Sequence, residues 1–166
     1  IRLSHHSSAW LGDCEFRLIG PAVLAKRYEG TDVTPETCQQ DIHRLFHHDP
    51  AFQSALSVLE EGVYLFGHSH IQWNWQDPDR KIFLINPGSC GLPLDFSPGS
   101  VPYTVLTVSE GGTVSIEEIR VPFDKQGYAE VLKGSEQFAA ATVWTEVITK
   151  EWLKTREHMT FFLEFA

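Results

Sequence analysis

The sequence predicts a mixed α/β fold of the α+β type, because helical and strand patterns follow one another along the chain. A helix start stands at Thr34-Pro35, where threonine suits the N-cap and proline the first helical position. An unbroken apolar run, Val63-Tyr64-Leu65-Phe66, is typical of a buried strand. From Ile71 to Gln76, apolar and polar residues alternate, as in a strand with one covered face. We therefore expect a sheet, antiparallel in part, packed against helices.

Two short helices are predicted ahead of the buried strand. The first begins at Thr34, and the second begins at Asp49-Pro50, which repeats the pairing of a capping side chain with a proline. Gly62 is the expected C-terminal stop of the second helix. The apolar positions at helical spacing are Ile42, Leu45 and Phe46, then Phe52, Leu56 and Leu59. Residues 10–30 are mixed and poorly periodic, so we expect a loop and a short strand there.

Two β-hairpins are predicted in the middle of the chain. The first pairs residues 71–76 with 81–85 across the turn Asp77-Pro78-Asp79-Arg80. The second pairs residues 103–109 with 114–121 across Glu110-Gly111-Gly112. Because hairpins are antiparallel, this part of the sheet cannot be wholly parallel.

The tail from residue 124 to residue 166 reads as helical, with one short and one long helix meeting near Gly134-Ser135. We therefore divide the chain into a domain of residues 1–123 and a helical extension of residues 124–166. The extension either packs on the domain or lies at a homodimer interface. Its apolar end would be costly to expose, and the residues concerned are Met159, Phe161, Phe162, Leu163 and Phe165.

The composition is that of a soluble globular protein, with 166 residues of which 42% are hydrophobic and 21% charged. The sequence has no apolar run long enough to span a bilayer and no basic leader, so we expect a cytoplasmic protein without a membrane partner. Cys14, Cys38 and Cys90 are odd in number, which argues against a disulfide framework. The net charge of −9 argues against binding to a nucleic-acid polymer.

Histidines stand where two predicted strands end. Gly67-His68-Ser69-His70 follows the apolar run directly, and residues i and i+2 of an extended segment point the same way. His68 and His70 should then converge on one place. A second short apolar stretch, Ile1-Arg2-Leu3, ends in Ser4 and His5. Because neutral imidazole is the commonest metal ligand among side chains, His5, His68 and His70 are the candidate metal ligands.

Several segments together resemble the calcineurin-like metallophosphoesterase family, and in particular its small bacterial and archaeal phosphodiesterase branch. Leu3-Ser4-His5-His6-Ser7 is similar to the family's strand-end His-Gly element, with His6 in the place of the glycine. Gly67-His68-Ser69-His70 is similar to its Gly-His-x-His element. Residues 82–91, with the turn Asn86-Pro87-Gly88-Ser89, and residues 103–108 are similar to the strands that follow. The resemblance covers residues 1–121 in order.

This resemblance implies a metallophosphoesterase that hydrolyses phosphodiesters or phosphomonoesters with a water activated by two divalent metal ions. The fold it implies is the C-terminal half of a four-layer α/β/β/α sandwich, followed by C-terminal helices. His5 and His68 would bind one ion and His70 the other, the metal being Mn, Fe, Zn or Ni. His6 would either contact the substrate phosphate or be a loop imidazole that faces solvent or bonds to backbone, and no catalytic residue is assigned within this chain. The substrate would be small, for example a dinucleoside polyphosphate.

The sequence departs from the family at the carboxylate-bearing elements Asp-x-His, Gly-Asp and Gly-Asn-His, which are missing. Asp41-Ile42-His43, Gly12-Asp13 and His47-His48-Asp49 match them only in letters, because they lie between the two histidine elements and not before them. We therefore expect this chain to be the C-terminal half of a longer protein. Two alternatives remain: a non-catalytic relative that binds a partner, and a single-zinc hydrolase that uses His5, His68 and His70.

Overall fold

The computed structural model describes residues 1–28, 31, 33–91, 93–94 and 100–141, and within them the expected α/β fold class is confirmed. The strands are β1 (Arg2–Leu3), β2 (Gly62–Leu65), β3 (Gln72–Asp77), β4 (Ile82–Pro87), β5 (Ser100–Val108) and β6 (Val114–Pro122). The helices are α1 (Ser8–Leu11), α2 (Cys14–Ile19), α3 (Pro21–Arg27), α4 (Pro35–His48), α5 (Pro50–Ser57), α6 (Lys125–Lys133) and α7 (Glu136–Ala140).

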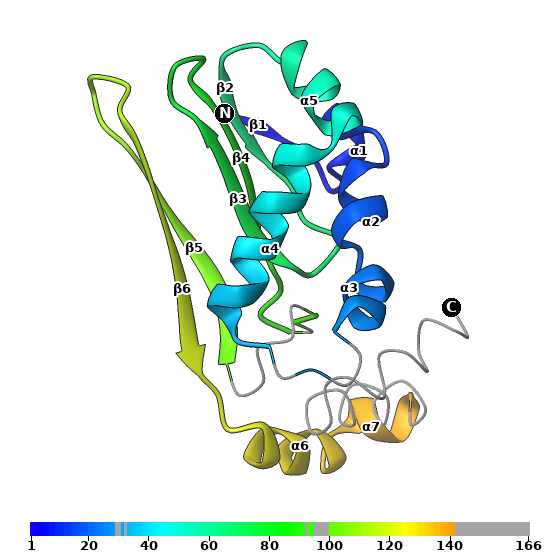
Figure 1. Cartoon of the computed structure of the whole chain (residues 1–166). Helices are drawn as coiled ribbons and strands as arrows, with labels where there is room; N and C mark the ends of the chain where they lie inside the picture. Colours follow the sequence, from blue (N-terminus) through cyan, green and yellow to red (C-terminus); the bar gives the residue numbers. More distant parts are fainter. Residues whose placement is uncertain (29–30, 32, 92, 95–99, 142–166) are drawn as a thin grey trace.

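A four-stranded sheet in the order β1-β2-β4-β3 forms the centre of the molecule (Figure 1). β1, β2 and β4 run parallel, whereas β3 is antiparallel to β4. The predicted hairpin over residues 71–85 is thus confirmed, with Trp75 opposite Leu84. β5 and β6 form a separate two-stranded sheet, which confirms the second predicted hairpin.

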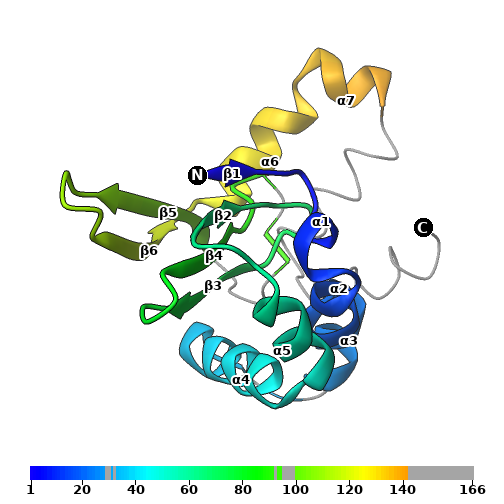
Figure 2. The same ribbon diagram turned by 90° about the horizontal axis from the view of Figure 1, so that it is seen from above.

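The sheet lies between a helical layer and the β5–β6 hairpin (Figure 2). Helices α1 to α5 cover one face, and the large side chains buried there include Trp73, Tyr64 and Phe46. The other face presents a smaller buried cluster, which the hairpin covers; its members are Val63, Phe83 and Ile85. Because β4 is packed on both faces, its residues from Ile82 to Asn86 are all buried.

The two proline-started helices are confirmed as α4 and α5. The Thr34 side chain accepts a hydrogen bond from the Thr37 backbone N–H, and Asp49 accepts one from Phe52. The expected stop at Gly62 is wrong, because α5 ends at Ser57 and Gly62 begins β2. The guanidinium of Arg80, in the β3–β4 turn, donates to the exposed carbonyls at this helix end, which are those of Leu56, Ser57 and Leu59.

The expectation of a loop and a short strand over residues 10–30 is also wrong, since this segment contains the end of α1 and all of α2 and α3. Each of these helices has seven residues or fewer, so none repeats its apolar spacing often enough to be seen as a period. Leu11, Ile19 and Leu24 are nevertheless fully buried in the main core.

The predicted break near Gly134-Ser135 is confirmed, because Gly134 caps α6 and α7 begins at Glu136. The longer part of the predicted extension and its apolar end, residues 142–166, lie outside the described residues. The homodimer interface expected there stays a prediction. Among the helices that the structure describes, none has both the length and the apolar character needed to cross a membrane.

Candidate metal centre

Two parallel neighbouring strands deliver the histidine loops to the same edge of the sheet. The Ser4 N–H donates to the Leu65 carbonyl at 3.0 Å, which carries the β1–β2 pairing one residue further. The Gly67 N–H then donates to the His5 carbonyl at 3.1 Å. Because the carboxyl ends of parallel strands meet at one edge, the residues that follow β1 and β2 lie side by side.

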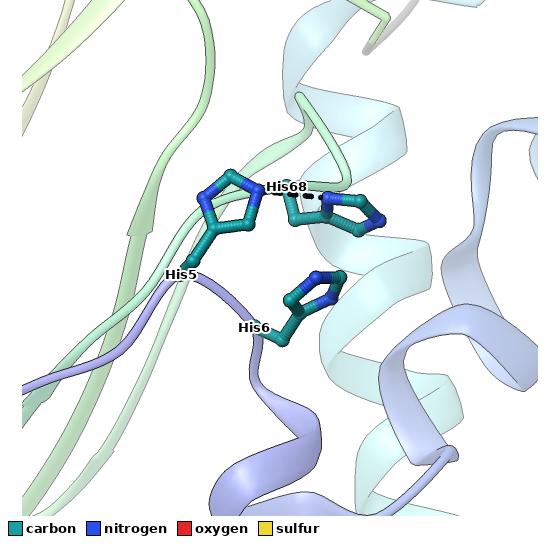
Figure 3. Close-up of side chains that lie close together, drawn as sticks. All are labelled: His5, His6 and His68. Carbon is teal, nitrogen blue, oxygen red and sulfur yellow. Dashed lines mark hydrogen bonds between the residues drawn. The ribbon is translucent and has the colours of Figure 1, made fainter.

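His5, His6 and His68 form one cluster at this edge (Figure 3). A nitrogen from each ring can be chosen so that all three lie within 4.8 Å of one another. His5 Nε2 and His68 Nδ1 are 3.0 Å apart and share a hydrogen bond. The rings of His6 and His68 lie with their centroids 3.6 Å apart. His5 and His68 are exposed and His6 is half-buried, so an ion could reach the cluster from solvent.

His68 occupies an unusual backbone conformation. Its φ of 74° lies in the left-handed region, and the Ser69 N–H donates to the Gly67 carbonyl at 3.0 Å. A bond from residue i+2 to residue i around a positive φ is the mark of a strained γ-turn centred on His68. Strain of this kind in a non-glycine residue persists only where the surroundings hold it, and it often marks a functional site.

The γ-turn changes the outcome predicted for His70. Convergence of His68 and His70 required an extended backbone, but His70 also has a positive φ, of 60°, and that premise is wrong. The structure groups His6, which we expected to contact substrate, with His5 and His68 in place of His70. His70 lies near enough to affect the pKa of His68, and its carbonyl accepts a hydrogen bond from Leu94 at 3.0 Å. Its assignment to a second ion stays a prediction.

The pKa of His68 lies below its ordinary value. Desolvation by burial is the largest cause, and the neighbouring imidazoles of His6, His5 and His70 add to it by charge repulsion. A lowered pKa keeps the imidazole neutral at neutral pH, and only the neutral ring has a lone pair to give a metal. The lowered pKa therefore favours the ligating form of His68 in the metal-free protein.

This lowered pKa has a measurable effect on stability. The unfolded chain binds a proton at His68 more readily than the folded chain does, so the folded protein loses stability as pH falls below the unfolded pKa, about 6.5. We expect the free energy of unfolding of the metal-free protein to fall between pH 7.5 and pH 5.5, and to fall less in a His68→Gln variant. Urea titrations at several pH values measure this. Identical pH profiles for the two proteins would contradict a lowered pKa at His68.

A buried polar network lies directly behind the cluster, and sequence reasoning did not find it. Glu15 of α2 is fully buried, and its Oε1 accepts hydrogen bonds from the Ser69 hydroxyl, the Trp73 indole and the Asn86 amide, at 2.6, 2.8 and 2.8 Å. The one local signal was that Glu15 stands four residues before Ile19, on the apolar side of a helix.

The acidic residues that imitate family motifs are engaged elsewhere. Asp41 lies within α4, as predicted, and accepts hydrogen bonds from Arg44 and Tyr28, which hold its pKa below the usual range. Asp49 caps α5 and pairs with Arg17. Within the described part of the chain, no carboxylate joins the three histidines in a metal-sized group. His43 and His47 are exposed on α4, where their rings stack on Trp75.

An apolar groove of about 370 Å³ opens beside the histidine loops, between the β1–β2 edge and β5. Leu3, Leu65, Phe66, Ile85 and Leu106 form most of its lining. It also includes Ser4 and Gly67, the residues that precede His5 and His68 in the chain. A ligand held at the cluster would therefore have an apolar surface next to it.

Comparison with known proteins gave no relative. The chain matches no protein-family model, no curated protein and no solved structure.

Proposed function

We propose that this chain forms part of a metal-dependent phosphoesterase in which His5, His6 and His68 hold a divalent metal ion. The observation that supports this most strongly is the meeting of three imidazoles at the carboxyl ends of the parallel strands β1 and β2. Ligand sites in α/β sheets are commonly built beyond these strand ends. Three protein ligands with a remaining open position are also the usual arrangement at a catalytic zinc ion.

The residues present fit such an ion. Three nitrogen donors lie within 4.8 Å of one another, and the lowered pKa of His68 favours the neutral, ligating form. A bound divalent ion would bring the pKa of a coordinated water to about 7 and would neutralise charge on a phosphoryl oxygen. His5, His6 and His68 would orient the ion, and the γ-turn would fix the direction of the His68 ring.

The acidic character of the chain bears on the substrate. A net charge of −9 gives no general attraction for phosphate, so an anionic substrate would depend on the local charge of the ion. This favours a small phosphorylated molecule over a nucleic-acid polymer. The apolar groove beside the loops could take an uncharged part of the substrate, as in a small phosphodiester such as a dinucleoside polyphosphate.

The resemblance to the calcineurin-like metallophosphoesterases supports a more detailed version of this proposal. One helical layer and two β layers are consistent with residues 1–123 forming the C-terminal half of a four-layer α/β/β/α sandwich. His70 would then hold a second ion. The carboxylates of such a two-metal centre would come from Asp-x-His, Gly-Asp and Gly-Asn-His elements, which this sequence does not contain.

A second candidate function is a hydrolase with a single zinc ion. It is favoured by the grouping of His5, His6 and His68 without a carboxylate, since three histidines suffice for a catalytic zinc. It needs no element beyond those in this sequence. The detailed version of the first candidate needs a second ion at His70, whereas the single-zinc hydrolase needs only one. The two candidates also differ in the chemistry of the ester that is cleaved.

The test combines metal content with turnover. The metal-free protein is loaded with Zn²⁺ or Mn²⁺, the bound ions are counted by plasma mass spectrometry, and hydrolysis of bis-p-nitrophenyl phosphate, p-nitrophenyl phosphate and p-nitrophenyl acetate is followed. Metal-dependent cleavage of a phosphoester supports our proposal. One zinc per chain with cleavage of the acetate alone supports the single-zinc hydrolase. Bound metal without any turnover favours either a non-catalytic relative or a centre that needs the carboxylate-bearing elements missing from this sequence, and the absence of bound metal contradicts both enzyme candidates.

A further inference from the structure

The buried carboxylate of Glu15 joins three segments that are distant in the sequence. Its Oε1 accepts hydrogen bonds from Ser69 in the histidine loop, from Trp73 in β3 and from Asn86 in β4. All four side chains are buried from solvent. A carboxylate is costly to bury, so its retention in the core calls for a reason beyond the packing of α2.

The network reaches both neighbours of His68. Ser69 is bonded to Glu15 directly, and the Asn86 amide also donates to the Ser69 hydroxyl at 2.9 Å and to the Gly67 carbonyl at 3.2 Å. Gly67 and Ser69 are the two ends of the γ-turn. Hydrogen bonds from Asn86 to both ends, and from Ser69 to Glu15, therefore fix the turn on either side of His68.

The same turn of α2 touches the histidine ring itself. Phe16, the residue after Glu15, lies with its ring centroid 5.2 Å from that of His68. The positive φ of His68 is costly for a residue with a side chain, and contacts from several sides are what keep such a conformation populated. The hydrogen bond to the Ser69 hydroxyl and the contact with the His68 ring both come from the beginning of α2.

We propose that Glu15 is a positioning residue for the metal centre: its carboxylate holds the γ-turn over residues 67–69 so that His68 faces His5 and His6. The inference rests on the proposed function for its metal-binding consequence. It does not need Glu15 to touch metal or substrate. Residues that orient metal ligands in this way typically contribute a factor of about 10–100 to metal affinity.

The test compares Glu15→Ala and Glu15→Gln with the matched control Ile19→Val, which removes one methylene from a fully buried residue in the same helix. Zinc affinity is measured by competition with a chromophoric chelator at a temperature where each protein is folded. We expect Glu15→Ala to weaken zinc binding by about 10–100-fold. Glu15→Gln keeps an acceptor oxygen and should recover most of this loss, while Ile19→Val should leave the affinity within about twofold. Unchanged affinity in Glu15→Ala, or equal weakening in Ile19→Val, would overturn the proposal.

Zinc binding by a Ser69→Ala variant and hydrogen exchange at the Ser69 amide give two further tests. If Glu15→Ala does not fold, Ser69→Ala takes its place, because it removes one of the three hydrogen bonds to Glu15. It must then weaken zinc binding by several-fold, on the order of the lower end of the 10–100-fold range.

Hydrogen exchange of the Ser69 amide in the metal-free protein, measured relative to the amides of β4, tests the positioning role alone. Exchange that is faster in Glu15→Ala, less affected in Glu15→Gln and unchanged in Ile19→Val supports it even if the wild-type protein binds no metal and the proposed function fails. Equal protection in all variants overturns it.

Discussion

His68→Ala is expected to lower zinc affinity by at least about 100-fold and to abolish any phosphoester turnover, because it removes one of three ligands. His68 is hydrogen-bonded to His5 and its ring contacts that of His6. Its removal therefore leaves His5 and His6 without a third metal ligand. Isothermal titration with Zn²⁺ and hydrolysis of bis-p-nitrophenyl phosphate measure the two effects on one preparation.

The matched control for this variant is His47→Ala. His47 is an exposed histidine on α4 that stacks on Trp75 and does not belong to the cluster. Its replacement should leave zinc affinity and turnover unchanged. Retention of both properties in His68→Ala would remove the cluster from the mechanism, and equal losses in the two variants would point to non-specific binding by surface imidazoles.

Gly88→Ala is expected to destabilise the protein by roughly 2–5 kcal/mol, as the sum of a backbone cost and a steric cost. Gly88 has a φ of 78°, in the left-handed region. A Cβ at this position would lie 2.8 Å from Pro102 Cγ and 3.1 Å from Gln72 Cβ, where the β5–β6 hairpin meets the central sheet. Pro102 and Gln72 are both buried, so relief would require movement of the hairpin.

Gly112→Ala separates the two costs. Gly112 has the same φ of 78°, but a Cβ there would meet nothing within 4 Å. Its replacement should cost only the backbone part, about 1–2 kcal/mol. Urea unfolding of the two variants gives the difference, which reports the close approach of the hairpin to the Asn86-Pro87-Gly88-Ser89 turn. If Gly88→Ala is no less stable than Gly112→Ala, the packing of the hairpin described above is incorrect.

Local signals in the sequence were sufficient for much of the fold. The first hairpin follows from the alternation over residues 71–76, both hairpins follow from turn residues, and α4 and α5 follow from a capping side chain beside a proline. In each case the signal and the structure lie within a few neighbouring residues. The end of α5 was missed because its partner is Arg80, which is brought to it by the β3–β4 turn.

Only the part of the site that follows directly from the pairing of β1 and β2 could be predicted from the sequence. His5 and His68 were expected together because each follows a strand, and β1 and β2 pair in parallel. The convergence of His68 and His70 was predicted from an extended backbone, but both residues have a positive φ, so the alternation ends there. The assignment of His70 to a second ion stays a prediction. Glu15 could not be placed, since its three hydrogen-bonding partners come from segments more than fifty residues further along the chain.

The central claim is that His5, His6 and His68 together bind one divalent ion, and nitrogen-detected NMR of histidine-labelled protein tests it most directly. The chain has eight histidines, and each imidazole gives its own nitrogen signals. On addition of one equivalent of Zn²⁺, we predict that the ring nitrogens of His5, His6 and His68 shift to values typical of metal ligation, while those of His43, His47 and His48 do not. A titration in which none of the three cluster histidines responds, or in which the α4 histidines respond first, would contradict the account.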